Sequence, residues 1–130
     1  MHGWLYLKDE WAKNHPFFDG LPAGGLLNYS YYGEIIPDDT WAGQQPPDEV
    51  VAAAINASQG YSSGILTSVY RFGEGRFVIN TLRIREALGK NPAAERLLRN
   101  MLNWAASQRD RPLAPVPADF DKTLTALKYK

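Results

Sequence analysis

Two apolar runs, residues 65–72 and 76–82, meet at the short turn Gly73-Glu74-Gly75. Both runs are rich in branched and aromatic side chains, which favour extended structure. Glycine on both sides of the turn suits a tight reversal, because glycine adopts positive φ without steric cost. The stretch therefore predicts an antiparallel β-hairpin with positive φ at Gly75.

The glycines of this turn do not have the spacing of a phosphate-binding loop. A P-loop needs Gly-x-x-x-x-Gly-Lys followed by Ser or Thr, and a dinucleotide loop needs three glycines ahead of a helix. Here a predicted strand follows the turn, and neither spacing is present. We interpret the turn as structural.

A helix is predicted after the hairpin, over residues 92–107. Asn91 supplies an N-cap, and Pro92 suits the first helical position. Apolar residues then recur at helical spacing, and we expect this stripe to dock on the sheet. The stripe consists of Ala94, Leu97, Leu98, Met101, Leu102 and Ala105.

The first half of the chain gives weaker patterns. Residues 8–14 could form two helical turns that end before His15-Pro16, because the residue before proline avoids the α region. The tyrosines and isoleucines of residues 26–37 predict a strand bent at Gly33. Residues 50–56 could open a helix, but their short length favours a buried strand.

A chain of 130 residues has the length of one ordinary domain. We expect a single α/β domain over residues 1–107. A proline-rich connector and tail, residues 108–130, should pack on it. The tail could end in a short helix over residues 122–130, with Leu124 and Leu127 directed inward.

Charge and composition exclude several classes of function. Lysine plus arginine, 14, equals aspartate plus glutamate, 14, which argues against nucleic acid and acidic membrane surfaces as partners. Cysteine is absent, which excludes thiol nucleophiles, thiolate metal sites and disulfides. No apolar run reaches the length of a membrane span. The N-terminal residues do not have the pattern of a signal peptide, so we expect none.

The few histidines and paired carboxylates favour structural roles. His2 and His15 do not have the spacing of a metal-ligand set, so we predict no metal and no cofactor. We expect His15 to be a structural hydrogen-bonding residue. Glu34, Asp38 and Asp39 could serve glycoside hydrolysis, which uses paired acids. However, Asp-Asp after proline is ordinary turn chemistry.

Aromatic side chains are the best candidates for binding. Sugars stack on exposed indole and phenol rings, and partner proteins bury them. The alternative is that these rings fill the core. The candidate residues for binding a sugar or a partner are Trp11, Tyr31, Tyr32, Trp41 and Tyr61.

Four stretches carry a resemblance to a known family: "HPFFDGLPAGG", "YYGEIIP", "YRFGEGRFVINTLRIREALGKNPAAERLLRNMLNWA" and "PADFDKTLTALKYK". Together they resemble the C-terminal region of large bacterial glycoside hydrolases related to family 2. That region is similar to a flavodoxin-like, class I glutamine amidotransferase-like domain, also seen as the trimerisation domain of certain β-galactosidases. The resemblance covers nearly the whole chain. It implies an α/β fold: a partial flavodoxin-like sheet with a C-terminal β-hairpin and a packed helix.

The sequence departs from the amidotransferase pattern at the catalytic residues. Those enzymes attack with a cysteine, which is absent here, and the stretch after the hairpin, residues 81–84, has no histidine. The early β-α units are also missing. The resemblance thus implies a non-catalytic accessory or assembly module of a glycoside hydrolase. Its partners would be the parent enzyme's domains or further copies of the chain.

Two other functions stay open. The chain could be a carbohydrate-binding module that uses its aromatic loops. It could also be a small independent glycoside hydrolase centred on Glu34, Asp38 and Asp39. Sugar binding needs rings open to water, assembly needs a broad apolar patch, and hydrolysis needs carboxyl groups that face each other across a cleft.

Overall fold

The computed structural model describes residues 8–43, 45–56, 61–73, 75–109 and 115–128. Its centre is a five-stranded sheet with the strand order β2-β1-β3-β4-β5. Each pair of neighbouring strands is antiparallel. The strands are β1 (Lys8–Ala12), β2 (Gly25–Leu26), β3 (Glu49–Asn56), β4 (Ser62–Phe72) and β5 (Gly75–Asn80).

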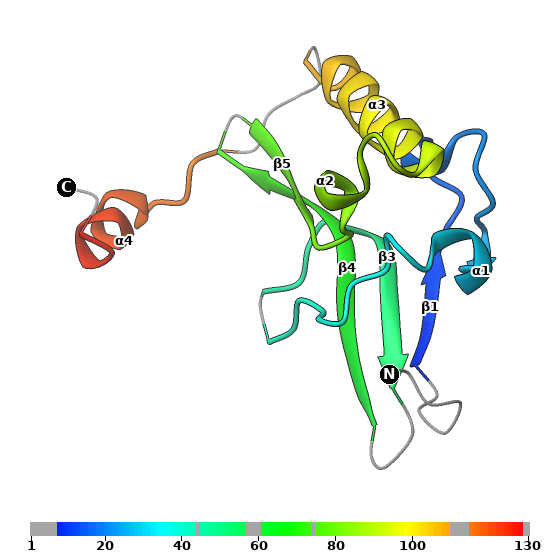
Figure 1. Ribbon diagram of the computed structural model, residues 1–130. Coiled ribbons are helices and arrows are strands. Elements are labelled where there is room, and N and C mark those ends of the chain that lie inside the picture. Colours follow the sequence, from blue (N-terminus) through cyan, green and yellow to red (C-terminus); the bar gives the residue numbers. More distant parts are fainter. Residues whose placement is uncertain (1–7, 44, 57–60, 74, 110–114, 129–130) are drawn as a thin grey trace.

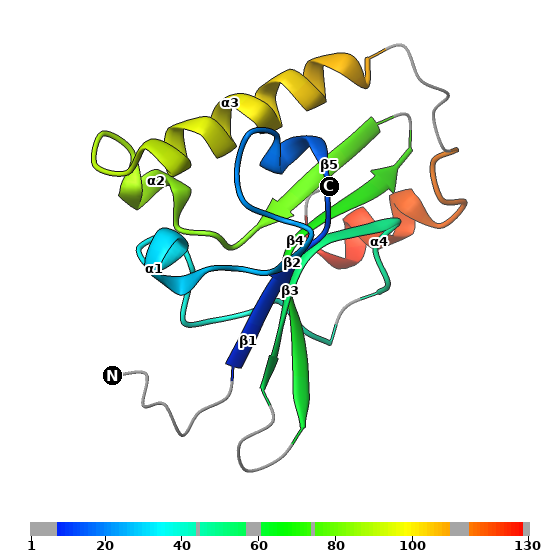
Figure 2. The same ribbon diagram turned by 90° about the vertical axis from the view of Figure 1, so that its right-hand side faces the viewer.

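One long helix covers one side of this sheet. It is α3 (Pro92–Ser107), and Figure 1 shows it lying on that side, next to the short α2. The last helix, α4, lies beyond the end of the β4–β5 hairpin, on the other side (Figures 1 and 2). The short helices are the 3-10 helix η1 (Pro16–Phe18), α1 (Tyr29–Tyr32), α2 (Ile84–Ala87) and α4 (Phe120–Ala126).

The core lies between α3 and the sheet. Phe17 of η1, Val51 of β3, Leu66 of β4 and Leu97 of α3 are fully buried there in one cluster. The pairing of β3 with β4 is irregular next to this cluster, between Val50 and Ala53. Such an irregularity lets successive residues point to the same side. Both Val51 and Ala52 can therefore belong to the core.

Three sequence predictions are confirmed. The hairpin forms as β4 and β5, residues 50–56 lie within the strand β3, and α3 spans residues 92–107. The Oδ1 atom of Asn91 accepts a 2.9 Å hydrogen bond from the amide of Ala93, as an N-cap should. His15 has the expected structural role, because its Nδ1 accepts the amide of Phe17 at 3.2 Å and caps η1.

Two local predictions are wrong. Residues 8–12 form a strand and not a helix, because they pair along their whole length with β3. This long-range pairing outweighs a weak helical propensity. Residues 26–37 are mostly not a strand: only Gly25–Leu26 is extended, and Asn28 then caps α1 by accepting the amide of Ser30 at 2.9 Å.

The turn of the hairpin is also placed differently. Gly73 has the positive φ, +52°, whereas Gly75 already pairs with Phe72 in the ladder. A side chain at Gly73 would also approach Val116 Cγ2 to 2.9 Å. The first glycine, and not the second, therefore requires the absence of a side chain.

The faces of the two outer helices differ from the predicted ones. On α3, Leu102 is 62% exposed, and the buried side is formed by Ala93, Ala94, Leu97 and Asn100. On α4, Leu127 follows the helix and is also 62% exposed. The apolar spacing predicts the bounds of α3 correctly, but the side that docks is different from the predicted stripe. The tail helix is predicted over residues 122–130, whereas α4 spans Phe120–Ala126, and residues 129–130 lie outside the described part of the chain.

The fold class is confirmed only at its coarser level. The chain is mixed α and β, with the predicted hairpin and packed helix. A flavodoxin-like sheet is parallel, with helices on both faces. Here the pairings are antiparallel and α3 covers one face (Figure 1). The pairing of β3 with β4 needs only the short connection between residues 56 and 62, which a parallel pairing could not use.

Candidate functional site

The face of the sheet away from α3 carries two of the predicted aromatic residues in one row. Trp11 of β1 pairs with Ala53 of β3, and Ala53 pairs with Ile65 of β4. Ile65 in turn exchanges both backbone hydrogen bonds with Trp41, at 2.8 and 2.7 Å. Residues directly opposite each other in an antiparallel sheet point to the same face. The row therefore runs Trp11, Ala53, Ile65, Trp41.

The neighbours of this row show which face it occupies. Ala12, Ala54 and Leu66 each lie next to a member of the row in sequence, and all three belong to the core under α3. Successive strand residues alternate between faces. Trp11, Ala53 and Ile65 must then point to the opposite side of the sheet.

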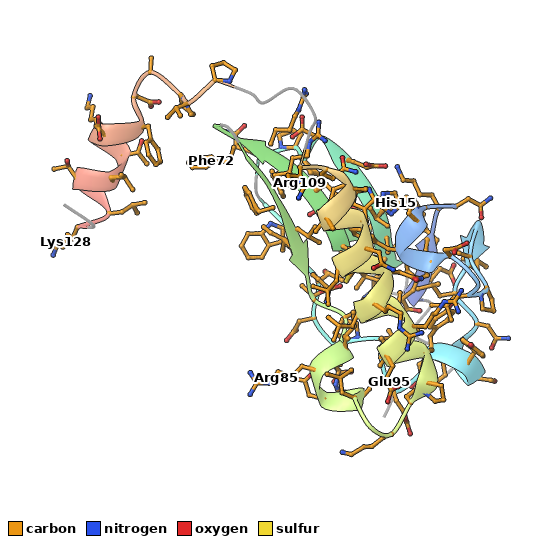
Figure 3. The ribbon with its side chains drawn as sticks, turned by 90° about the horizontal axis from the view of Figure 1, so that it is seen from above. His15, Phe72, Arg85, Glu95, Arg109 and Lys128 are labelled. Carbon is orange, nitrogen blue, oxygen red and sulfur yellow. The ribbon has the colours of Figure 1, made fainter. Side chains whose placement is uncertain are left out.

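The hairpin adds a second aromatic group to the same face. Tyr70 of β4 and Phe77 of β5 are directly paired, and their rings stack with centroids 5.2 Å apart. Their neighbours Val69 and Val78 pack in or against the core, so the two rings lie on the other side. Phe72 follows in alternation, and Figure 3 shows it directed away from α3.

Part of this face is covered by the segment that leads into β3. The hydroxyl of Tyr70 donates to the carbonyl of Gln45 at 3.1 Å. Asp48 accepts hydrogen bonds from both the amide and the side chain of Arg71, at 2.5 Å each. These hydrogen bonds, the one from the amide first, hold the pKa of Asp48 below its ordinary value. The loop is thus tied to β4 at its end.

Three residues of this face are exposed, whereas Ala53 and Ser68 on the same side are buried. Trp41 is 42%, Phe72 45% and Phe77 44% exposed. On the tail, the ring of Phe120 contacts Phe72 at its edge, with centroids 5.1 Å apart. We call this surface the open sheet face and define it by Trp11, Trp41, Val50, Ile55, Ile65, Tyr70, Phe72, Phe77 and Ile79.

The other predicted aromatic residues lie elsewhere. Tyr32 is 1% exposed, and its hydroxyl donates to the carbonyl of Pro22 at 2.6 Å. Burial, together with the adjacent Tyr31, raises the pKa of Tyr32 to about 12. Tyr31 is on α1 and 44% exposed, and Tyr61 precedes β4 and is 76% exposed. Tyr32 is thus a core residue. Tyr31 packs edge-on against it, with ring centroids 4.8 Å apart, and Tyr61 is an exposed ring outside the residues that define the open sheet face.

The carboxylates proposed for hydrolysis lie in the loop after α1. Glu34 lines a shallow hollow beside Lys90 and Asn91, and the Asn91 amide approaches its Oε2 at 3.5 Å. Asp38 and Asp39 are exposed and follow the buried Pro37. Neither aspartate lines the hollow that contains Glu34. This arrangement does not place them with Glu34 around one cleft.

Sequence reasoning missed the aromatic cluster of the hairpin. In the sequence alone, Tyr70, Phe72 and Phe77 indicate only strand structure. Their alternation with Val69 and Val78 was the available signal, because residues two apart share a face. The alternation could not reveal which of the two apolar faces α3 would cover.

The described part of the chain shows neither a metal site nor a membrane-spanning helix. Across those residues, no cluster of three or more potential metal-ligating side chains was found. Among the described helices, none is long and apolar enough to span a membrane. Comparison of the chain with protein-family models, with curated proteins and with solved structures gave no match.

Proposed function

We propose that the chain is a non-catalytic assembly module of a glycoside hydrolase and that it associates through the open sheet face. The observation that carries this proposal is the extent of apolar surface on the face opposite α3. Stacked and edge-on rings gather there at the hairpin, and two tryptophans lie in one row across three strands. Contiguous apolar surface of this kind marks interaction sites in soluble proteins.

The occupant assigned to the face is a second copy of the chain. The aromatic and aliphatic residues that define the face are uncharged, and the exposed Asp9, which pairs with Ile55 and shares the side of Trp11, is the charged residue next to them on β1. Two copies can bury the uncharged residues against each other if Asp9 stays in contact with solvent. A twofold interface also needs only one self-complementary patch. The link to a glycoside hydrolase rests on the sequence resemblance. The trimerisation domain of certain β-galactosidases, which is similar to the region that this chain resembles, likewise joins copies of one chain. The proposal does not depend on a flavodoxin-like topology.

Sedimentation velocity of the full chain tests the assembly. We expect reversible self-association at about 100 µM. Phe77→Glu should raise the dissociation constant of this self-association at least about tenfold and so favour the monomer. Leu102→Glu is the matched control, because Leu102 is a similarly exposed apolar residue on α3. A wild type that stays monomeric, or equal effects of both variants, would contradict the second copy as occupant.

The glycoside hydrolase part of the proposal has a separate test. The open reading frame that contains this chain should encode, or lie beside, a glycoside hydrolase domain. Absence of any such domain would remove the link to carbohydrate metabolism and leave the assembly proposal standing alone.

A carbohydrate-binding module is the second candidate. The row from Trp11 to Trp41 favours it, because two indoles flank the small Ala53 and Ile65. Three strand spacings separate the tryptophans, about 14 Å. A linear oligosaccharide could lie along such a strip. Trp41→Ala should then abolish oligosaccharide binding, whereas an assembly face should show no oligosaccharide binding in the wild type.

The hydrolase alternative is tested by activity. A panel of aryl glycosides should be turned over no faster by the wild type than by an Asp38→Asn, Asp39→Asn double variant. An activity that survives purification and disappears in the double variant would favour a small glycoside hydrolase over the assembly module.

A further inference from the structure

A second candidate site lies on the other side of the molecule, between η1 and α3. A hollow of about 770 Å³ opens there, within the size range of small-molecule sites. Figure 3 shows His15 beside α3 at this end of the molecule. Its aromatic wall is Trp104, and its polar lining comes from Asn14, His15, Asp19, Asn100, Asn103, Ser107 and Gln108.

Trp104 is held in place from one side. Its ring meets the ring of Phe17 edge-on, with centroids 5.1 Å apart, and lies 5.8 Å from the ring of His15. The same tryptophan also lines an adjacent hollow of about 510 Å³. It is half-buried, so a fixed indole stands with part of its surface open to a ligand.

The floor of the hollow is preorganised by an amide. The side-chain nitrogen of Asn100, which is 8% exposed, donates to the carbonyls of Phe17 and Asp19 at 3.0 and 2.9 Å. These bonds tie η1 to α3 and set the width of the hollow. At its rim, the exposed amides of Asn14 and Asn103 each offer a donor and an acceptor to a ligand.

The lining is close to neutral. Of the described residues that line the hollow, Asp19 alone carries a carboxylate, and its Oδ2 lies 3.9 Å from Arg96 Nη2. Burial lowers the pKa of His15, an effect that outweighs the opposing attraction of Glu49. The imidazole is therefore uncharged at neutral pH. The hollow also adjoins the C-terminal end of α3, whose dipole repels anions.

From this geometry we propose that the hollow binds an uncharged polyhydroxy ligand of monosaccharide size. Paired hydroxyl groups suit the side-chain amides, because both can donate and accept. The apolar side of a sugar ring suits the surface of Trp104. An anionic ligand would meet a neutral lining and a helix C-terminus. The hollow contains none of the residues that define the open sheet face, so ligand binding there can be tested independently of the proposed assembly.

Isothermal titration calorimetry of the full chain tests this site, with methyl β-D-glucopyranoside, methyl β-D-galactopyranoside and D-glucuronate as probes. We expect at least one neutral glycoside to saturate below about 100 mM, more tightly than glucuronate. Trp104→Ala should weaken that binding about tenfold or more. Leu102→Ala, at an exposed position of the same helix that does not line the hollow, is the matched control and should leave it unchanged.

A surface variant keeps the test independent of folding. Trp104 packs on Phe17, so its replacement can disturb the fold, and circular dichroism must accompany it. Asn103 is exposed, and Asn103→Ala should weaken binding about threefold or more while thermal unfolding stays unchanged. The proposal is overturned if neither glycoside saturates, if glucuronate binds as tightly, or if Leu102→Ala weakens binding as much as Trp104→Ala.

Discussion

At the scale of single residues, His15 joins three parts of the molecule. Its Nδ1 accepts the amide of Phe17, and its Nε2 lies 3.7 Å from the carboxylate of Glu49. Glu49 also forms an ion pair with Lys13. Protonation of Nδ1 would remove its lone pair and break the cap of η1. The neutral imidazole is thus the form that the fold uses.

This geometry predicts a pH dependence of stability. Because the folded-state pKa of His15 is lowered from 6.5, the unfolded chain binds a proton first as the pH falls. The contribution of His15 to the free energy of unfolding should therefore be complete above pH 6.5 and should decrease as the pH falls below that value. Asp48, whose pKa is lowered from 3.8, adds a similar loss only at more acidic pH.

Urea unfolding between neutral pH and the range just below 6.5 checks this dependence. His15→Asn is the matched variant, because asparagine can still accept the amide of Phe17 as an N-cap. The variant should show a flatter dependence in that range. If wild type and variant lose stability in parallel, the titrating group is not His15.

Thr67 and Ser68 are adjacent, fully buried hydroxyl residues with opposite predicted effects. The hydroxyl of Thr67 donates to Asn80 Oδ1 at 2.8 Å, whereas that of Ser68 has no hydrogen-bond partner among the described residues. Thr67→Ala should cost about 1–3 kcal/mol, and Ser68→Ala should be neutral or stabilise by up to about 1 kcal/mol. Chemical denaturation measures both. A large loss for Ser68→Ala would indicate a hydrogen bond that the structure does not show.

At the scale of elements, α3 gives the clearest prediction. Leu97 is 0% exposed and Leu102 is 62% exposed on the same helix. Leu97→Ala should lower the free energy of unfolding by about 2–5 kcal/mol, because it leaves a cavity under the helix. Leu102→Ala should change it by less than about 0.5 kcal/mol. Equal losses in thermal or urea unfolding would mean that α3 docks through a wider face.

Sequence predicted those elements whose signals are local. The glycines of the hairpin turn, and Asn91-Pro92 ahead of α3, act within a few residues of the structure that they specify. The strand β1 could not be predicted in this way, because its residues pair with residues of β3 that lie 40 to 48 positions later. The order of the sheet strands follows from such pairings as well.

The candidate site could be predicted only in part. The sequence predicts Trp11 and Trp41 as candidate binding residues, but their common row exists only through Ala53 and Ile65 on two other strands. The hollow at Trp104 was not predicted. It depends on the packing of η1 against α3, through the hydrogen bonds from Asn100 to Phe17 and Asp19.

At the scale of the whole molecule, the tail is connected to the rest by few contacts. None of the residues of α4 is buried. Phe120 meets Phe72 at the edge of the open sheet face, and Val116 lies over the turn at Gly73. α3 ends before the tail begins, where the backbone amide of Gln108 donates to the carbonyls of Ala105 and Ala106. The side-chain oxygen of Gln108 accepts a 2.6 Å hydrogen bond from Arg76 Nη1. Among the described residues, none after Gln108 belongs to the core.

A chain that ends at Gln108 should fold in one cooperative transition and lose less than about 1 kcal/mol of stability, as expected for removal of exposed contacts. The same truncation removes Phe120 and leaves the ring of Phe72 more exposed. If the open sheet face binds a second copy, the truncated chain should self-associate more strongly than the full chain in sedimentation velocity. If it instead becomes fully monomeric while still folded, the tail itself makes the contact between copies. The dimer interface would then lie on α4 and not on the sheet.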